Sequence, residues 1–284
     1  EVLGEIYEQF LGEVITVKDG SVEIVSKPEV RESGGVVPTP AFVADSIVEE
    51  TLGPVLYGKG PKELLEFTVA DICCGSGIFL LSAYDFLLGH FLDWYVNNGP
   101  ELYSGTAIYE SAEDRWALTF EEKRRILLEY VRGVDIDPNA VEVAQFSLLL
   151  KLIEDESEDA LADYIASKKK PVLPSLSDII RCGNSLVSPR EWRKVFGDLE
   201  GEIREKINPF DWDKEFEAEM QYGGFHVVIG NPPYIRIQRM VSFSPEEVDY
   251  YHNDKSPYTT AKQDNYDKYA LFIERSLYLV KSDG

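Results

Sequence analysis

The chain has 284 residues, which is enough for one large α/β domain or two small ones, and its 44% hydrophobic and 28% charged residues are typical of a soluble protein. The formal net charge of −23 argues against a phosphate-binding surface, because nucleic-acid-binding proteins usually present a basic face. The three cysteines fit neither a disulfide framework nor a zinc site, and with no secretory signal and no apolar run of about 18 residues they indicate a cytoplasmic protein without a membrane span.

The N-terminal segment, residues 1–33, is predicted to hold a helix and a hairpin. Residues 1–11 have the spacing of a short amphipathic helix. The apolar alternation at 14–17 and 22–25 predicts two strands joined by a tight turn at the Asp-Gly pair 19–20.

Residues 34–284 are predicted to form one catalytic α/β domain in which buried strands alternate with helices. Each strand is a short apolar run rich in β-branched residues, and each helix carries apolar residues at helical spacing. This alternation predicts a Rossmann-like, doubly wound and mostly parallel sheet. The predicted strands are residues 67–73, 131–136, 178–182 and 226–230, and the predicted helices run from Pro40 to about Leu52 and over 78–95, 120–130, 138–153 and 266–281.

Four polar stretches interrupt this pattern. Residues 97–119 are predicted to be an irregular inserted loop, which together with the following helix makes an insertion over 97–130. Residues 154–175, acidic and then lysine-rich, are interpreted as a solvated face and loop, and the charged stretch 189–222 as an insertion that partly covers the sheet edge. Residues 238–265 form a Tyr-rich stretch too long for a simple connection, which predicts a functional or mobile loop.

Both ends of the chain lead us to expect further sequence. The first residue is Glu1 rather than Met. No strand follows the helix predicted at 266–281, although a doubly wound sheet of this type should have one. We therefore expect the domain to be incomplete at its C-terminus.

Residues 231–234, with the sequence Asn-Pro-Pro-Tyr, directly follow the last predicted strand. In open α/β sheets, ligands bind just beyond the carboxyl ends of the strands. Two consecutive prolines stiffen this loop and leave its carbonyls free to accept hydrogen bonds. An Asn amide, a rigid carbonyl and an aromatic face together suit a flat group bearing an NH2, such as adenine, cytosine or a carboxamide. The alternative is a proline-rich turn in which Tyr234 only packs.

Polar residues at the ends of the first two strands predict a cofactor site. Gly75 and Gly77 allow close approach of the backbone to a ligand, although the glycine pattern alone is a weak signal. Asp71, at the end of their strand, could bind an ammonium group or only cap the turn. Asp135 ends the second strand, where a carboxylate can accept from both hydroxyls of a ribose. Asp137 competes for that role, but Asp-Pro before a helix is more often an N-cap.

The residues after the third strand and the glycine pattern narrow the choice of cofactor. Asn184 could bind an adenine edge through its amide, or it could be a turn residue next to a glycine. Phe79 stands where a dinucleotide pyrophosphate would need a close approach, and the third small residue of the dinucleotide fingerprint is absent. A cofactor with an adenosine end and no pyrophosphate fits better, and S-adenosylmethionine is the obvious one.

The chain contains five short motifs in one order: Pro-Thr-Pro at 38–40, the glycine loop at 71–77, Gly-Val-Asp-Ile-Asp-Pro at 133–138, Gly-Asn-Ser-Leu at 183–186 and Asn-Pro-Pro-Tyr-Ile-Arg at 231–236. This set resembles the N6-adenine DNA methyltransferases of restriction-modification and related phage-defence systems, in the arrangement where the cofactor motifs precede the catalytic one. The resemblance runs from about residue 34 to 284, and its order and spacing are far more specific than any single motif.

The resemblance implies that S-adenosylmethionine is the cofactor and assigns residues to it. Thr39 and the glycine loop, with Gly75 and Gly77, would hold the methionine end of the cofactor. Asp135 would hold its ribose, and Asn184 its adenine.

The resemblance also implies that the substrate is an adenine flipped out of double-stranded DNA. Asn231 and the carbonyl of Pro232 would accept hydrogen bonds from the target N6, and Tyr234, next to Pro233, would stack on the base. The lone pair of N6 is delocalised into the ring, so two acceptors that bind its hydrogens out of plane would expose it to in-line methyl transfer. No covalent enzyme intermediate is needed, which makes the three cysteines bystanders.

The chain departs from the family pattern at two places. Val-Pro-Thr-Pro stands at 37–40 where the family often has Tyr-Tyr-Thr-Pro, which puts an aromatic contact in doubt. The second base-stacking aromatic and the target-recognition domain are expected beyond Gly284. Basic surface on that domain, or on a target-recognition or restriction subunit, would supply the phosphate contacts that this acidic chain lacks.

Two other functions remain open. The carboxamide of a protein glutamine suits the same Asn-Pro-Pro-Tyr receptor, although the Pro-Thr-Pro segment at 38–40 and the large insertions favour DNA. A catalytically silent subunit could bind cofactor or DNA as a scaffold, but the intact Asn231 and Tyr234 argue against it.

Overall fold

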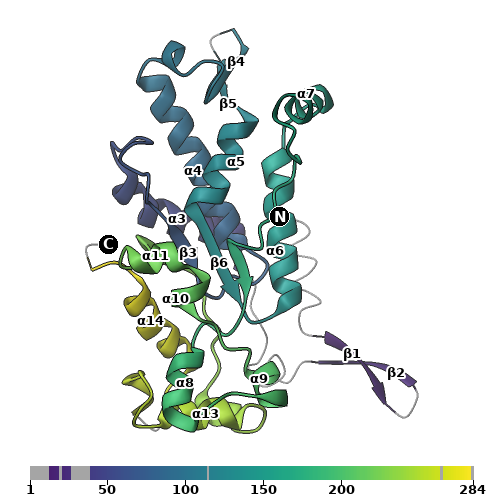
Figure 1. Ribbon diagram of the computed structural model, residues 1–284, viewed down its shortest axis with the longest axis vertical. Helices are drawn as coiled ribbons and strands as arrows, with labels where there is room; N and C mark the ends of the chain where they lie inside the picture. Colours follow the sequence, from purple (N-terminus) through teal and green to yellow (C-terminus); the bar gives the residue numbers. More distant parts are fainter. Residues whose placement is uncertain (1–12, 19–20, 27–38, 114, 263–264, 283–284) are drawn as a thin grey trace.

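A four-stranded parallel sheet forms the centre of the computed structural model, which describes residues 13–18, 21–26, 39–113, 115–262 and 265–282 (Figure 1). The strand order is β7-β6-β3-β8, and all three pairings are parallel. The strands are β3 (Val69–Asp71), β6 (Val131–Asp135), β7 (Ile180–Cys182) and β8 (Val227–Ile229), each at a predicted position and shorter than predicted. The Rossmann-like α/β fold expected from the sequence is thereby confirmed.

Helices cover both faces of this sheet, so that the molecule has three layers (Figure 1). Neighbouring residues of a strand point to opposite faces, and accordingly Val69 belongs to one apolar cluster and Ala70 to the other. The first cluster is packed by α3 (Ala41–Leu56), α4 (Ile78–Asn97), α5 (Phe120–Tyr130) and α6 (Pro138–Ile153), all four predicted from the sequence.

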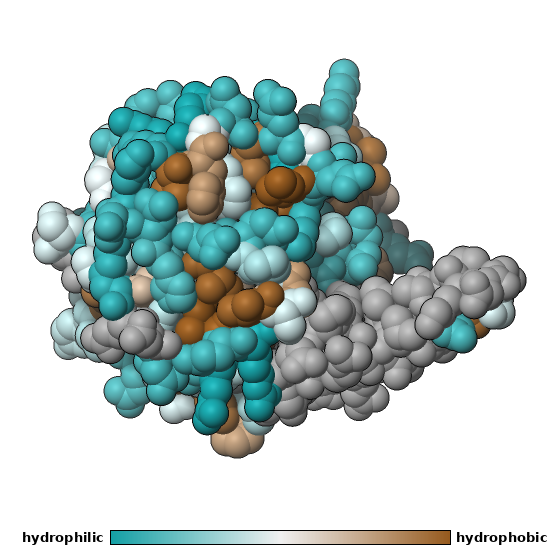
Figure 2. Space-filling view, turned by 90° about the horizontal axis from the view of Figure 1, so that it is seen from below, coloured by the Kyte–Doolittle hydropathy of each residue, from teal (hydrophilic) through white to brown (hydrophobic). Residues whose placement is uncertain are grey.

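The second cluster is packed by short helices that follow β7 and β8. They are α8 (Pro189–Phe196), α9 (Gly201–Ile207), α10 (Trp212–Glu215), α11 (Glu217–Gln221), α12 (Ile237–Met240), α13 (Pro245–His252) and α14 (Lys268–Leu279). The side of the molecule seen from below is mainly hydrophilic, with separate apolar patches (Figure 2). None of the helices in the described part of the chain is both long enough and apolar enough to cross a lipid bilayer.

The stretch 189–222 lies against β7, which is an edge strand of the sheet. The guanidinium of Arg181 on β7 is 2.5 Å from the Glu215 carboxylate, and it also lies over the Phe216 ring at 5.6 Å. These contacts place 189–222 against the sheet face that the second apolar cluster packs, and its coverage of the sheet edge stays a prediction.

The N-terminal hairpin is also confirmed. Strands β1 (Glu13–Lys18) and β2 (Ser21–Ser26) are antiparallel, with Lys18 opposite Ser21, and the Asp-Gly pair at 19–20 lies outside the described residues. The helix predicted at 1–11 and the residue Pro38 lie outside the described residues.

The prediction of an irregular loop at 97–119 was wrong. The stretch contains a short 3-10 helix, η1 (Pro100–Leu102), and a hairpin of β4 (Ile108–Ala112) and β5 (Arg115–Leu118). Within the hairpin strands, only the two anchoring residues Ile108 and Leu118 are buried. An alternation with so few apolar positions does not stand out in the sequence.

The prediction of a solvated loop at 154–175 was wrong in part, because helix α7 (Glu158–Lys168) occupies its centre. The Ser157 side chain caps this helix by accepting from the Ala160 amide. Tyr164 packs edge-on against Phe120, with ring centroids 4.8 Å apart. The N-cap and this aromatic contact therefore stabilise a helix that cannot be recognised from the pattern of charged residues in the sequence.

The prediction that residues 238–265 form a loop was also wrong. The stretch contains α12, α13 and the 3-10 helix η2 (Thr260–Lys262), and its three tyrosines, Tyr250, Tyr251 and Tyr258, are 0% exposed. Each hydroxyl has a partner, so the rings can be buried without leaving a polar atom unpaired. The stretch is part of the core, and its tyrosines only make it look polar.

Candidate functional site

The loops that follow the four parallel strands lie at one edge of the sheet, and they contain most of the predicted site residues. One contact joins this edge to the segment before α3. Asn231 Nδ2 donates a hydrogen bond of 3.1 Å to Thr39 Oγ1, across 192 positions of sequence. The segment predicted to hold a cofactor and the stiff tetrapeptide predicted to hold a substrate therefore touch each other.

The glycine loop is tied to the end of β6. The amide of Gly75 donates to Asp135 Oδ2 at 2.8 Å, and the amide of Asp137 donates to Asp135 Oδ1 at 2.9 Å. These two bonds fix the direction of the Asp135 carboxylate at the sheet edge. Gly75 has a φ of +52°, and a Cβ added there would meet nothing within 4 Å, so space lies open beside the loop. Gly77, by contrast, packs closely on α6, where an added Cβ would lie 2.9 Å from that of Ala144.

Asp137 acts as the N-cap of α6. Its Oδ1 accepts from the Asn139 amide at 3.0 Å, and Pro138 follows at the first helical position. The capping interpretation of Asp137 is confirmed, which leaves Asp135 as the better candidate for a ribose.

Asp71 is buried beneath this edge, with only 1% of its surface exposed. Its Oδ1 accepts from the Cys73 amide at 3.0 Å, and a Cβ placed on Gly230, directly before the tetrapeptide, would lie 2.5 Å from that oxygen. Burial raises the pKa of Asp71 to about 7, the Cys73 amide opposes this rise, and the charge of Asp135 adds to it. Two neighbouring carboxylates, one of them poorly solvated, favour a ligand that carries positive charge.

Asn184 is 2% exposed and lies in the loop after β7. Its Oδ1 accepts from the Leu186 amide at 3.1 Å, so it does make the local turn contact that was the alternative to ligand binding. Its Nδ2, however, is buried and has no hydrogen-bond partner among the described residues. The next residue, Ser185, donates to the Ile72 carbonyl at 2.5 Å, which ties this loop to the one after β3.

Tyr234 is 65% exposed, so it is not a core packing residue. Its ring lies 5.4 Å from that of Tyr269 on α14, with an angle of 44° between the planes. Pro232 and Pro233 are half-buried beside it. Tyr269 was not among the predicted site residues, although it is an aromatic residue at the start of the helix predicted after the tetrapeptide.

The cysteines near the site are poor nucleophiles. Burial raises the pKa of the thiols of Cys73, Cys74 and Cys182 above their ordinary value, and nearby carboxylates add to the rise. At neutral pH all three are thiols rather than thiolates.

Comparison with known proteins identifies a family that this chain matches. The family model of the Eco57I restriction-modification methylase matches residues 129–284, a range that includes Asp135, Asn184 and the tetrapeptide. The type II restriction enzyme and methyltransferase RM.Eco57I of Escherichia coli is 35% identical over 286 residues, which cover 100% of this chain and 26% of that protein. The adenine-specific methyltransferase PglX of Streptomyces coelicolor is 29% identical over 213 residues, covering 73% of this chain and 15% of that protein.

The chain thus spans about a quarter, or less, of the length of these curated relatives. Among solved structures, the nuclease-deletion mutant of the Type ISP restriction-modification enzyme LlaGI, in complex with a DNA substrate mimic, superimposes with a TM-score of 0.47 at 16% identity. That superposition covers 88% of this chain and 17% of the other.

Proposed function

Since this chain belongs to the Eco57I restriction-modification methylase family, we propose that it transfers the methyl group of S-adenosylmethionine to N6 of an adenine flipped out of double-stranded DNA. The observation that carries the proposal is the 3.1 Å hydrogen bond between Asn231 and Thr39, which joins the candidate base and cofactor sites. We assign residues 34–284 to the catalytic domain. The methylation reaction would be part of a cytoplasmic restriction-modification or related defence system. The expected partners are double-stranded DNA and a target-recognition or restriction subunit or domain.

The residues at the sheet edge fit S-adenosylmethionine, which when bound supplies a methyl group on a positively charged sulfur. Asp135, oriented by two amides, would accept hydrogen bonds from the ribose hydroxyls. The open space beside Gly75 admits a close ligand, and the buried Asp71 suits an ammonium group. The Nδ2 of Asn184, which has no partner in the described part of the chain, would donate to a ring nitrogen of the cofactor's adenine. Thr39 would complete the methionine end.

The tetrapeptide would bind the target adenine. The bond to Thr39 engages the nitrogen of the Asn231 amide, so its oxygen stays available as an acceptor. That oxygen and the Pro232 carbonyl would accept the two N6 hydrogens out of the ring plane, which exposes the nitrogen lone pair to the methyl group. The exposed ring of Tyr234, with Pro233 beside it, would stack on the base, a contact worth about 1–3 kcal/mol.

The acidic charge of the chain is unevenly distributed along the sequence. Residues 231–284, which begin with the tetrapeptide, have a net charge of −1, from 7 basic and 8 acidic side chains. Residues 1–230 have a net charge of −22, from 21 basic and 43 acidic side chains. The segment that would meet DNA is thus nearly neutral, which weakens the objection that the net charge of −23 raises.

Transfer from methyl-labelled cofactor tests the proposal. The full protein is incubated with duplex DNA and, separately, with glutamine-bearing protein, and labelled DNA is digested to nucleosides. We expect label in N6-methyladenosine. Label on protein glutamine would instead support the carboxamide alternative, and cofactor binding without any transfer would support a silent subunit.

A substitution at Gly75 tests the cofactor site. Gly75→Ala places a methyl group in the open space beside the loop and strains a positive φ, at a cost of about 1 kcal/mol in stability. The added methyl group would displace the bound cofactor from its hydrogen-bonding groups at the sheet edge. Losing one buried hydrogen bond costs about 1.4 kcal/mol of binding free energy or more, so we expect calorimetry to show an affinity for S-adenosylmethionine that is lower by about tenfold or more. The matched control is Gly105→Ala, which has a φ of +72° and equally open space on the inserted hairpin segment. Equal losses of affinity in the two variants would contradict the assignment.

A further inference from the structure

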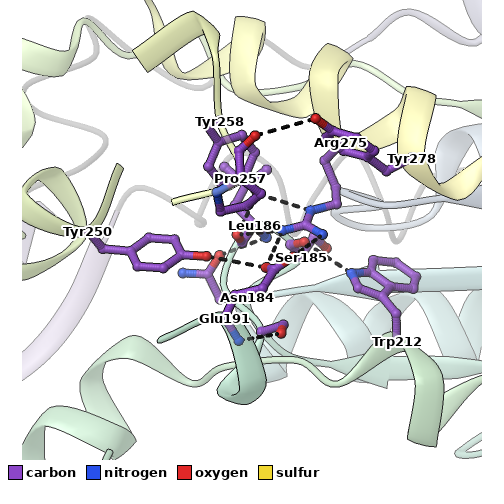
Figure 3. A network of polar contacts seen from close by, with 11 residues as sticks. Asn184, Ser185, Leu186, Glu191, Trp212, Tyr250, Pro257, Tyr258, Arg275 and Tyr278 are labelled. Carbon is purple, nitrogen blue, oxygen red and sulfur yellow. Dashed lines mark hydrogen bonds and ion pairs between the residues drawn. The ribbon is translucent and has the colours of Figure 1, made fainter. Parts of the chain in front are cut away.

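A buried arginine on α14 holds the loop that contains Asn184 (Figure 3). Arg275 is 5% exposed, and its Nη2 donates to the Leu186 carbonyl at 3.1 Å and to Glu191 Oε2 at 2.7 Å. The Leu186 amide is the group that donates to Asn184 Oδ1. Arg275 therefore grips the residue that sets the orientation of the Asn184 side chain.

Other side chains hold the same loop from separate segments (Figure 3). The hydroxyl of Tyr258 donates to the Leu186 carbonyl at 2.5 Å and accepts from Arg275 Nε at 3.0 Å. The indole nitrogen of Trp212 donates to the Ser185 carbonyl at 3.1 Å. A loop whose consecutive carbonyls are both held by buried donors has little freedom to move.

The helix that carries Arg275 also reaches the tetrapeptide. The ring of Tyr269 on α14 lies 5.4 Å from the ring of Tyr234. The two residues of α14 are six positions apart, which corresponds to about 9 Å along a helix axis. One rigid helix thus touches the loop after β8 and the loop after β7.

We propose that Arg275 is a positioning residue, which fixes the Asn184 loop relative to the tetrapeptide and thereby sets the affinity for the cofactor. This role rests on the proposed function, because it assumes that Asn184 faces the cofactor's adenine. Arg275 itself is buried beneath the loop and acts through Leu186 and Asn184.

Only a guanidinium can make these contacts together. Its planar fork donates to the Leu186 carbonyl, to Glu191 and to the Tyr258 hydroxyl at once, whereas a lysine ammonium is a point charge on a flexible stem. Arg275→Lys keeps the positive charge beside Glu191 but cannot make all of the hydrogen bonds that the guanidinium makes. An effect of Arg275→Lys can therefore be attributed to the lost hydrogen bonds rather than to a lost positive charge.

The test compares Arg275→Lys with wild-type protein at a temperature where both are folded. We expect the dissociation constant for S-adenosylmethionine to rise by about tenfold or more, since a buried hydrogen bond to a charged group is lost, while kcat at saturating cofactor changes little. Hydrogen exchange at the Leu186 amide, measured without cofactor, should become faster by a similar factor. Tyr258→Phe, which keeps the ring and loses the hydroxyl, should show the same changes to a smaller extent and serves if Arg275→Lys does not fold.

Arg125→Lys is the matched control. Arg125 forms a guanidinium network beside the other apolar cluster, with bonds to Glu122, Glu129 and the Tyr130 hydroxyl, although its side chain is more exposed than that of Arg275. A purely structural role for Arg275 would lower the melting temperatures of both lysine variants and leave cofactor affinity and Leu186 exchange unchanged, and this result would overturn the proposal. Wild-type protein that binds no S-adenosylmethionine would contradict the proposed function, and this role with it. Faster Leu186 exchange with unchanged cofactor affinity would overturn the role assigned to Arg275 alone.

Discussion

Asn231→Ala is expected to lower kcat for methyl transfer by a factor on the order of 10²–10³ or more, the loss seen when a preorganised hydrogen-bonding group is removed from a reacting centre. The Asn231 oxygen is one of the two acceptors proposed to expose the N6 lone pair, and alanine offers no substitute. Affinity for S-adenosylmethionine should change by less than about threefold, because the interaction is made chiefly with the target amine during transfer. Single-turnover rates and calorimetry measure the two quantities separately.

Thr39→Val is the control for this variant, because Asn231 also donates to Thr39 Oγ1. Valine has nearly the shape of threonine and removes the same hydrogen bond from the other side, while the Asn231 amide stays in place. We expect Thr39→Val to weaken cofactor binding and to leave most of the transfer rate at saturating cofactor. If Asn231→Ala abolishes cofactor binding as well, the catalytic role assigned to Asn231 is wrong.

The centre of the sheet could be predicted because β3 is short and buried on both faces and β6 is largely buried. The runs around Val69 and Val131 are mainly apolar and bounded by polar or glycine-rich turns, and the helices between them have clear helical spacing. Parallel strands place their carboxyl ends at one edge, so the grouping of the site loops followed from the strand assignments.

The elements that the sequence did not reveal are held by tertiary contacts between residues of polar appearance. Tyr250, Tyr251 and Tyr258 are wholly buried because their hydroxyls find carboxylate or carbonyl partners 4 to 72 positions away. The partners of Tyr250 and Tyr258, which lie 59 and 72 positions away, cannot be inferred from local spacing, so a core segment was taken for a loop.

The candidate site shows the same limit. Motif order indicated that Thr39 and Asn231 serve one reaction, but the hydrogen bond between them spans 192 positions and comes only from the fold. The contact of Arg275 with Leu186 spans 89 positions and belongs to no motif. Residues that touch a ligand can thus be predicted from their chemistry, whereas the residues that position them depend on packing.

Asp71→Asn is expected to remove a pH dependence of stability. Because burial raises the pKa of Asp71 to about 7 in the folded protein, the folded state keeps a proton that the unfolded state releases near pH 4. The stability that this proton supplies is fully present below about pH 4 and is lost as the pH rises from there through about 7. Between about pH 5 and pH 8 the wild-type protein should lose about 2–3 kcal/mol from this group, a loss that Asp71→Asn avoids. Urea unfolding of both proteins at the two pH values measures the difference.

The same substitution tests whether Asp71 meets a cation. A positive ligand beside the carboxylate lowers its pKa, so binding releases a proton, and the wild-type affinity for S-adenosylmethionine should rise on the order of tenfold between about pH 6 and pH 7.5. In Asp71→Asn the affinity should be lower at about pH 7.5 and nearly independent of pH, because the amide keeps the acceptor for Cys73 but cannot ionise. Calorimetry in buffers of different ionisation enthalpy counts the released proton directly. A wild-type affinity that stays flat over this range would show that no positive group binds at Asp71, and the ammonium end of the cofactor would have to be placed elsewhere.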